Sequence, residues 1–408
     1  MKKRLVVIGG GAAGFFCAVN AAAFDKDLEV IIIEKTGKLL SKVKVSGGGR
    51  CNVTHACFSI AEMIKNYPRG ANFLKKAFHQ FFTSDTVQWF ADRGVVLKTE
   101  ADGRMFPVTD NSETIIDCLV KEANKYNVQI RMNCEVKSVD PDKENNKVEV
   151  RLANDESIIC DAVCIACGGY AKSIQFDYLR KLGHSIIPPV PSLFTFNIPD
   201  DPIKGLMGIS SLAEVKINGT KLIQKGPVLI THWGLSGPAI LKLSAFGAIE
   251  LAEKKYDFTI SVNWVPGENE NTLLPIFRSL RIKLAAQKIV NRNPFQLPNR
   301  LWEHLISQSG IPEDIRWADL PAKNQNYLIK NLASQSFHVK GKTTFKEEFV
   351  TSGGIELSEI DANRMQSKIV PGIYFAGEIM NVDGVTGGFN FQHAWTSGYV
   401  AAKALTTN

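Results

Sequence analysis

Three glycines near the start of the chain have the spacing of a phosphate-binding turn. Gly9, Gly11 and Gly14 follow the G-x-G-x-x-G pattern, between an apolar run of strand length and a small-residue segment of helical character. The first glycine permits a sharp turn, the second lets a pyrophosphate approach the backbone, and the third lets helix and strand pack closely. Free amides at the start of the helix would then face the phosphates.

An acidic residue after the next apolar run indicates which dinucleotide the turn would bind. Residues 30–33 predict a second strand, and Glu34 follows it, 20 residues after Gly14. A carboxylate at this spacing accepts hydrogen bonds from the adenosine ribose and repels a 2′-phosphate. The alternative is a glycine-rich turn followed by a surface Glu. Strand, helix and acid together favour FAD or NAD over NADP.

A second glycine-rich element, SGGGRCN, occupies residues 46–52. Its three consecutive glycines expose backbone amides to an anion or a flat ring, and Arg50 and Asn52 add side-chain donors. The alternative is a flexible surface loop. The basic residues before it, Lys42 and Lys44, favour an anion-binding element.

The C-terminal stretch predicts a second wall of the same site. Residues 372–378 form an apolar strand that ends in Gly377-Glu378, and the pair Gly387-Gly388 opens a long helix that continues through residue 404. A helix that begins at glycines offers free N–H groups and the positive end of its dipole. In a flavoprotein these groups could stabilise the anion formed when the isoalloxazine ring is reduced. An ordinary β–α junction is the alternative.

The central sequence predicts a mixture of elements around these motifs. We expect a helix at residues 112–126, a strand at 128–139, a hairpin from 147–152 and 157–160, and a strand at 161–169 that ends in a glycine turn. Cys164 and Cys167 could pass for a redox or metal pair. Residues three apart on a strand point to opposite faces, so we interpret them as structural and predict no metal site.

The segment 231–238, THWGLSGP, resembles a nucleophile elbow only superficially. The G-x-S-x-G pattern fails because Pro238 stands at the second glycine position. We therefore exclude hydrolysis and predict that Ser236 caps the following helix, with Pro238 in its first turn.

Composition places the chain among ordinary globular proteins. Its 408 residues suffice for two or three domains, and 48 Lys and Arg against 41 Asp and Glu give a net charge of +7. We interpret the positive residues as scattered, which disfavours nucleic acid as a partner. Eight cysteines, mostly in apolar segments, fit reduced core residues, and no run reaches membrane-spanning length. We expect a cytoplasmic protein that does not bind membranes.

Six motifs together resemble a family of bacterial FAD-binding proteins, called aminoacetone-oxidase-like enzymes or NAD(P)/FAD-dependent oxidoreductases. They are GGGAAG (9–14), SGGGRCNVT (46–54), DGRMFP (102–107), THWGLSGPAIL (231–241), TSGGI (351–355) and AGEIMNVDGVTGGFNFQHAW (376–395). The resemblance implies an α/β fold with a Rossmann-like, glutathione-reductase-like FAD-binding domain from both chain ends, residues 1–190 plus 340–408. It also implies an inserted β-barrel-like domain, 191–266 with 336–350, and a helical subdomain, 267–335.

The resemblance also implies which residues hold FAD. At matching positions these are Gly9, Gly11, Ala13, Gly14, Glu34, Lys35, Ser46, Gly48, Gly49, Arg50, Asn52, Val136, Gly377, Glu378, Asp383, Gly388, Phe389, Asn390 and Phe391. Neighbours near them complete the predicted site: Ala12, Lys42, Gly47, Cys51, Gly168, Gly384 and Gly387. The chain departs from the family at His55, where Asn is usual, and at Asn381, where Asp is usual.

These features predict an oxidoreductase with noncovalent FAD and a small-molecule substrate. Candidates for lining the substrate face are Arg104, Thr231, His232, Trp233, Thr351 and Ser352, and no residue is assigned as acid or base. The absence of a second G-x-G-x-x-G unit argues against a dedicated NAD(P)H domain, so NAD(P)H could act only as a transient co-substrate. The alternatives are an RNA-modifying flavoenzyme and a non-catalytic flavin-binding redox sensor. The sequence does not indicate an oligomeric state.

Overall fold

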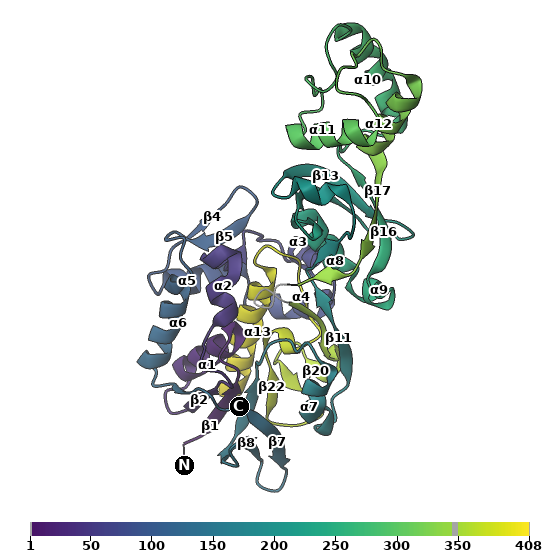
Figure 1. Ribbon diagram of the computed structural model, residues 1–408. Coiled ribbons are helices and arrows are strands. Elements are labelled where there is room, and N and C mark those ends of the chain that lie inside the picture. Colours follow the sequence, from purple (N-terminus) through teal and green to yellow (C-terminus); the bar gives the residue numbers. More distant parts are fainter. Residues whose placement is uncertain (1, 345–349, 408) are drawn as a thin grey trace. The chain divides into compact units, whose positions relative to one another are not determined.

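The computed structural model of the chain describes residues 2–344 and 350–407. These residues form two compact units (Figure 1). Unit 1 combines the described residues of Met1–Ser192 and Phe345–Asn408, and unit 2 is Leu193–Thr344. Each unit is described by itself below.

Unit 1 is built on a seven-stranded sheet whose central strands are parallel. The strand order is β20-β21-β22-β10-β1-β2-β6, and the five strands from β22 to β6 run parallel. Their bounds are β1 Arg4–Ile8, β2 Glu29–Ile33, β6 Gln129–Arg131, β10 Ala162–Ile165, β20 Ile360–Asp361, β21 Gln366–Ser367 and β22 Ile373–Phe375. The runs LVVI and VIII are buried throughout, as expected for parallel strands covered on both faces.

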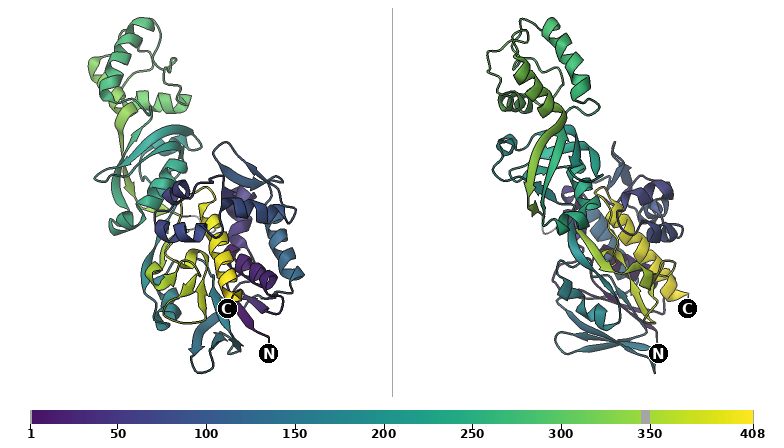
Figure 2. Two further views of the ribbon diagram at one scale, coloured as in Figure 1. Left: turned by 180° about the vertical axis from the view of Figure 1, so that it is seen from behind. Right: turned by 90° about the vertical axis from the view of Figure 1, so that its right-hand side faces the viewer.

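Two helices that begin at glycines pack against each other in unit 1. Helix α1, Ala12–Phe24, follows Gly11, and helix α13, Phe389–Thr406, follows Gly388. A Cβ at Gly398 would lie 2.7 Å from the carbonyl oxygen of Ala13, so only glycine permits this approach. Figure 2 shows α13, in yellow, running alongside the N-terminal segment in both views. Both chain ends therefore contribute to unit 1.

Short elements surround this core. The helices of unit 1 are α2 Ser41–Gly49, α3 Ile60–Met63, α4 Ala71–Phe78, α5 Thr83–Ala91, α6 Glu113–Lys125 and α7 Asp177–Lys181, with 3-10 turns η1 Ile64–Asn66, η2 Ser173–Phe176, η4 Leu357–Glu359 and η5 Gly377–Ile379. The strands of its smaller sheets are β3 Thr54–His55, β4 Leu97–Thr99, β5 Arg104–Pro107, β7 Val136–Asp142, β8 Lys147–Leu152, β9 Ser157–Cys160, β11 Ile186–Ser192 and β19 Val350–Ile355. The predicted helix at 112–126 and the predicted hairpin from 147–160 are confirmed.

The single strand predicted at 128–139 is wrong. Residues Gln129–Arg131 belong to the parallel sheet, whereas Val136–Asp142 pair with β8 in a different sheet. Asn133 separates the two with a left-handed φ of 56°. Asn tolerates this conformation better than most residues, so the apolar periodicity alone did not reveal the break.

Unit 2 contains a seven-stranded antiparallel sheet that curls back on itself. The strand order is β17-β16-β13-β14-β15-β12-β18. The bounds are β12 Thr195–Asn197, β13 Ser210–Ile217, β14 Ile223–Ile230, β15 Gly234–Ser236, β16 Asp257–Asn263, β17 Gln335–Lys340 and β18 Lys342–Thr343. Strands β17 and β18 lie at opposite ends of this order, yet only Gly341 separates them in the chain. The two ends of the sheet are thus joined covalently, which makes it barrel-like.

Five helices complete unit 2, with one short 3-10 turn. They are α8 Pro238–Phe246, α9 Ala248–Glu253, α10 Glu270–Lys283, α11 Asn299–Gln308 and α12 Ala322–Ser334, and the turn is η3 Pro202–Leu206. Figure 1 shows α10, α11 and α12 grouped beyond the strands. Phe277 of α10, Trp302 of α11 and Trp317 from the connection before α12 are buried in a core cluster that continues into the barrel.

The predicted cap of helix α8 is wrong by one residue. Gly237 is the N-cap, and Pro238 occupies the first helical position as predicted. Ser236 ends β15, and its hydroxyl accepts a hydrogen bond from the Thr195 hydroxyl at 3.0 Å. Gly237 has a φ of 89°, which favours glycine, so the chain turns there and Ser236 stays in the sheet.

Candidate functional site

The first glycine turn has the geometry that a bound phosphate needs. A Cβ at Gly9 would lie 2.4 Å from the Ala166 carbonyl oxygen, and a Cβ at Gly14 would lie 2.0 Å from the Gly9 carbonyl oxygen. Packing within the protein therefore requires glycine at both positions. Gly11 differs, because a Cβ there would meet no protein atom within 4 Å. A side chain at this position would instead project into the space where the motif predicts a pyrophosphate.

Glu34 lies at the end of β2 and turns back toward the glycines. Its Oε2 accepts a hydrogen bond from the backbone N–H of Gly10 at 2.9 Å. Its Oε1 accepts from the backbone N–H and the hydroxyl of Thr36, both at 2.8 Å. These bonds hold the half-buried carboxylate beside the turn, where a ribose would be recognised. Lys35, the next residue, is exposed, with its ammonium 5.8 Å from the centre of the Tyr170 ring.

The SGGGRCN run forms the end of α2 followed by a left-handed turn. Ser46 is extended, while Gly47, Gly48 and Gly49 have φ values of 59°, 70° and 85°. A Cβ at Gly48 or Gly49 would meet nothing within 4 Å, so these amides border open space. Cys51 continues the turn with a φ of 62°, and burial raises the pKa of its thiol to about 12, which keeps it protonated.

The DGRMFP run packs beside this turn. Strands β3 and β5 pair Thr54 with Met105, and the Arg50 guanidinium lies 4.0 Å from the centre of the Phe106 ring. Arg50 Nη1 is also 2.6 Å from Glu100 Oε1. Arg104 donates to Glu100 at 3.0 Å and to Asp102 at 2.7 Å. The half-exposed Arg104 therefore has two carboxylate partners, and its contact with a substrate remains a prediction.

The N-terminal and C-terminal walls meet at Gly388, the N-cap of α13. A Cβ there would lie 2.5 Å from the Thr54 carbonyl, which requires glycine. With its amide oriented to satisfy both of its groups, Asn52 accepts from the Gly388 N–H and donates to the Thr54 carbonyl, each at 3.0 Å. His55 Nδ1 is 3.0 Å from the Gly387 carbonyl oxygen, and its ring stacks on Phe389. The departure at His55 thus has a structural role at this junction.

The loop before α13 is held by its own side chains. Asn390 accepts from the Gly384 N–H at 2.8 Å and donates to the Gly384 carbonyl at 2.9 Å. Phe391 stacks on Trp395, and the Phe389 carbonyl accepts from the Tyr67 hydroxyl at 2.7 Å. This loop is therefore ordered by the protein itself.

Glu378, in the C-terminal segment, contacts both helix α2 and strand β19. Its Oε2 is 2.6 Å from Lys42 Nζ, and its Oε1 accepts from the backbone N–H of Thr351 at 2.7 Å. Gly377 precedes it with a φ of 74°, and a Cβ there would lie 2.8 Å from Ala13 Cβ on α1. The structure thus places Gly377 and Glu378 next to the first glycine turn.

Several buried polar atoms of unit 1 lack a protein partner. Among them are Thr351 Oγ1, Ser352 Oγ and Asn381 Oδ1. Ile355 and Met380 form a β-bridge, so the strand that carries Thr351 and Ser352 lies against the segment that carries Asn381. Buried polar atoms usually find hydrogen-bond partners, and unpaired ones point to a missing ligand or water. Together with the open space at Gly11, Gly48 and Gly49, they fit a bound dinucleotide with polar groups along its length.

A family model described as the HI0933-like protein Rossmann domain matches residues 3–404. The chain belongs to the HI0933-like Rossmann family. Membership and the parallel sheet confirm the predicted α/β fold with a Rossmann-like FAD-binding domain, and they support an FAD-dependent oxidoreductase.

Two curated relatives span the whole chain. One is the ribosomal RNA dihydrouridine synthase of Escherichia coli strain K12, 30% identical over 98% of this chain and 97% of its own. Another is the 3-dehydro-bile acid delta(4,6)-reductase of Clostridium scindens, 27% identical over 98% of each chain. Among solved structures, 3-ketosteroid-delta4-(5alpha)-dehydrogenase from Rhodococcus jostii RHA1 has a TM-score of 0.51 and 12% identity, over 98% of this chain and 97% of its own. At that identity the likeness concerns the fold alone.

Other predicted residues of this HI0933-like protein lie outside these contacts. Thr231, His232 and Trp233 belong to unit 2, where they form a tight turn with the Thr231 hydroxyl 3.1 Å from the Gly234 carbonyl oxygen. The His232 ring lies 4.7 Å from the Trp233 ring at an interplanar angle of 45°, and Trp233 is 46% exposed. Val136 begins β7 in the sheet of β7, β8 and β9. Gly168 has a φ of 76° and open space around its Cβ position. Their roles remain predictions.

A buried ion pair beneath the C-terminal wall was missed by sequence reasoning. Asp383 is fully buried, and its carboxylate pairs with Arg69 and accepts from the Ser192 hydroxyl at 2.8 Å. Burial raises the pKa of Asp383, while the Arg69 guanidinium opposes this shift. Asp383 was predicted to bind the cofactor, and the structure gives its carboxylate protein partners. No local pattern around Arg69 or Ser192 signals this contact.

His393 is a second residue that the motifs did not single out. It lies in α13, is 2% exposed, and neither ring nitrogen has a partner. Burial lowers its pKa to about 4, so the ring is neutral at physiological pH. Its neighbour Ser397 accepts from the Gly377 N–H at 2.9 Å, which places this turn of α13 beside the Gly377–Glu378 wall.

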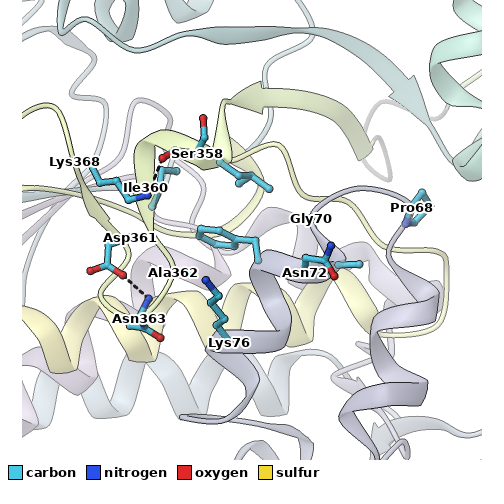
Figure 3. A pocket seen from close by; sticks show the side chains of 13 residues that line it. Pro68, Gly70, Asn72, Lys76, Ser358, Ile360, Asp361, Ala362, Asn363 and Lys368 are labelled. Atoms are coloured by element: carbon cyan, nitrogen blue, oxygen red, sulfur yellow. Dashed lines mark hydrogen bonds between the residues drawn. The ribbon is translucent and has the colours of Figure 1, made fainter.

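A separate pocket of about 600 Å³ lies on unit 1, between α4 and residues 357–368 (Figure 3). Its lining includes Asn72, Lys76 and Lys368, and the Lys368 ammonium donates to the Ser358 carbonyl at 2.8 Å. None of the predicted cofactor residues lines it. Within the described ranges, no helix is long and apolar enough to cross a membrane.

Proposed function

We propose that this chain is an FAD-dependent oxidoreductase with noncovalently bound FAD. The observation that carries the proposal is the open space at Gly11, Gly48 and Gly49, where a Cβ would meet no protein atom within 4 Å. The positive φ values of Gly48 and Gly49 already favour glycine, whereas at Gly11 neither packing nor φ does. FAD supplies hydride transfer when bound. The first glycine turn and Glu34 would hold its adenosine diphosphate half. The glycines of residues 46–49, Glu378 and the start of α13 would hold the remainder.

The chain's own residues supply charge to the site. The N-terminal amides of α1 and α13 offer positive potential where phosphates and a reduced ring carry negative charge. The Glu34 carboxylate disfavours a 2′-phosphate beside the first turn.

The relatives favour a class of reaction for this site. Dihydrouridine differs from uridine by two hydrogens across a C=C bond conjugated to a carbonyl group, and a delta(4,6)-reductase of a 3-dehydro compound also reduces C=C bonds conjugated to a ketone. We therefore propose that this chain reduces a conjugated C=C bond. A hydride adds to the carbon remote from the carbonyl, and a proton adds to the adjacent carbon. A transiently bound NAD(P)H is the proposed source of the hydride.

The proposed substrate is a uridine of RNA. The similarity to a ribosomal RNA dihydrouridine synthase extends over 98% of the chain, and the net charge of +7 suits a polyanion. A small unsaturated ketone is the second candidate, favoured by the bile acid reductase relative. The eight free cysteines support the reducing cytoplasm as the compartment.

The test combines flavin spectroscopy with nucleoside analysis. The flavin-loaded protein is mixed anaerobically with NADH or NADPH, and bleaching of the visible flavin band is expected. The reduced protein is then incubated with an unmodified ribosomal RNA transcript or with an unsaturated 3-ketosteroid, and products are identified by mass spectrometry. Dihydrouridine in the RNA supports the first substrate, and a saturated steroid supports the second.

Other outcomes would overturn parts of the proposal. A flavin band bleached by amines such as aminoacetone, and not by NAD(P)H, would indicate an amine oxidase. A flavin that no donor reduces would indicate a non-catalytic redox sensor. A protein purified without FAD that fails to bind added FAD would remove the cofactor assignment.

A further inference from the structure

Unit 2 contains a strongly basic segment, residues 271–302, that is not evident from the net charge of +7 for the whole chain. Residues 271–302 contain no Asp or Glu. They contain six cationic residues, Arg278, Arg281, Lys283, Lys288, Arg292 and Arg300. The interpretation of the positive residues as scattered is therefore wrong for this part of the chain. This segment runs from α10 to the start of α11.

Most of these side chains are exposed. Helix α10 buries Leu273 and Phe277 in the core of unit 2. Arg278 is exposed, and Ile282, one turn later on the same side, is 80% exposed. Lys283, Lys288 and Arg292 are exposed as well. The outer side of this region is therefore cationic with one apolar residue.

Backbone contacts bring another cation to the same place. Lys288 and Arg316 are partners in an antiparallel β-bridge, and Arg316 is exposed. The Ile289 N–H donates to the Ile315 carbonyl at 3.0 Å, and Arg281 Nη2 donates to the Ala318 carbonyl at 2.8 Å. We leave Arg300 out of the cluster, because its guanidinium donates to the Gly205 carbonyl. We define the basic cluster as Arg278, Arg281, Lys283, Lys288, Arg292 and Arg316.

Among the described residues, no ion pair involves this cluster, although Asp314 and Asp319 flank its member Arg316 in the sequence. The ion pairs of unit 2 among the described residues join Lys254 with Glu250 and His338 with Asp257, outside the segment. Acidic residues resume at Glu303 and within 313–319. An ordinary solvated surface mixes both signs of charge, whereas the segment 271–302 does not.

Helix stabilisation explains only part of the cluster. Arg281 and Lys283 lie in the last turn of α10, where cations interact favourably with the helix dipole. Arg278 lies before that turn, and Lys288 and Arg292 follow the helix. These additional Lys and Arg side chains are not explained by the helix dipole. A surface rich in them favours binding of a polyanionic partner.

We propose that the basic cluster docks the phosphate backbone of the RNA substrate. This inference rests on the RNA assignment made above. Phosphate contacts from Lys and Arg position a protein on nucleic acid without reading its sequence. The cluster thus contributes affinity, while the choice of uridine belongs to the flavin site.

The test compares two triple variants of the full-length, FAD-loaded protein. The first is Arg278→Gln/Lys288→Gln/Arg292→Gln in the cluster. The matched control is Lys216→Gln/Lys221→Gln/Lys225→Gln, which removes the same charge from exposed positions of β13, β14 and their connection. Binding of a fluorescein-labelled ribosomal RNA transcript is measured over a series of salt concentrations. Thermal unfolding and FAD content verify that each variant is folded.

We expect the cluster variant to bind RNA about tenfold or more weakly at low salt. The slope of log affinity against log salt should fall by about 2, since each lost phosphate contact removes about 0.7 for single strands. The control should keep most of its affinity and slope. Equal losses in both variants, or no loss in the cluster variant, would overturn the proposal. Equally tight binding of the wild-type protein to anionic lipid vesicles, with the same dependence on the cluster, would also count against an RNA-docking role.

The two proposals can fail separately. If the cluster variant loses RNA binding but the wild-type protein forms no dihydrouridine, the docking surface stands and the reaction assignment is lost. If the wild-type protein forms dihydrouridine and the cluster variant binds and reacts normally, the reaction stands and the surface is wrong. A folded cluster variant should still have its flavin reduced by NAD(P)H at the wild-type rate.

Discussion

The Lys42 ammonium lies 2.6 Å from the carboxylate of Glu378, a residue 336 positions later in the chain. The same carboxylate accepts a hydrogen bond from the backbone N–H of Thr351. Glu378 therefore links helix α2, strand β19 and the C-terminal wall of the cofactor site. Its two bonds differ in exposure, because the Lys42 side chain is about half exposed whereas Thr351 is fully buried.

This difference predicts unequal effects of two substitutions at Glu378. Glu378→Gln keeps an acceptor for the Thr351 N–H and loses only the half-exposed ion pair, so unfolding free energy should fall by less than about 1 kcal/mol. Glu378→Ala leaves a buried N–H unpaired and should cost about 1–3 kcal/mol. Urea denaturation of the flavin-free protein measures both. Equal costs for the two variants would contradict the hydrogen-bond argument.

Gly11 and Gly14 should respond differently to the same substitution. Gly11→Val places a side chain where no protein atom lies within 4 Å, so the fold should persist while FAD is lost. Gly14→Val places a Cβ 2.0 Å from the Gly9 carbonyl oxygen and should destabilise the fold by about 2–4 kcal/mol. The flavin content of the purified protein and its thermal unfolding distinguish the two results. A Gly11→Val variant with normal FAD content would refute the assignment of the turn.

Removing Arg69 should produce a pH-dependent loss of stability. In Arg69→Met the buried Asp383 loses its charged partner, and such a change typically costs about 3–5 kcal/mol near neutral pH. Burial already raises the pKa of Asp383, and loss of the guanidinium raises it further. The folded state then binds a proton more readily than the unfolded state, so stability falls as pH rises through the folded pKa.

The cost of Arg69→Met should therefore shrink as pH is lowered toward about 4, the ordinary range of an Asp. Denaturation of wild type and variant from neutral to acidic pH measures this trend. Asp383→Asn is the control, because it has no carboxylate to protonate and its stability should not show this trend. A cost that stays constant with pH would show that Asp383 is not the titrating group.

His393 predicts a pH dependence of the opposite sign. Burial lowers its pKa to about 4, whereas the unfolded chain has an ordinary value of about 6.5. Between these values the unfolded state binds the proton, so stability rises with pH and is lost as pH falls from about 6.5 to about 4. At about 1.4 kcal/mol per pKa unit, the loss of unfolding free energy over this range is on the order of 3 kcal/mol. His393→Phe keeps an aromatic ring without the titrating nitrogens and should flatten this part of the stability curve.

Comparison of His393→Phe with the wild-type protein at pH values on both sides of this window tests the effect. Identical slopes in His393→Phe and the wild-type protein would indicate that the imidazole is not held neutral by burial.

The sequence by itself determined the local features of this protein. The spacing of Gly9, Gly11 and Gly14 between apolar runs identified the nucleotide-binding turn, because strand, turn and helix each depend on adjacent residues. The hairpin from 147–160 and the helix at 112–126 followed from periodicity for the same reason. Where a single residue in an unusual backbone conformation decided the outcome, as at Asn133 and Gly237, the local pattern misled.

Only the tertiary structure decided which distant residues meet. Gly388 against Thr54, Glu378 beside Lys42, and Asp383 between Arg69 and Ser192 join positions from separate parts of the chain. Such contacts arise when β22 takes its place beside β10 in the sheet, and no spacing in the sequence encodes them. Burial of Asp383 and His393, and hence their shifted pKa values, likewise depends on the packing of elements that are far apart in the chain.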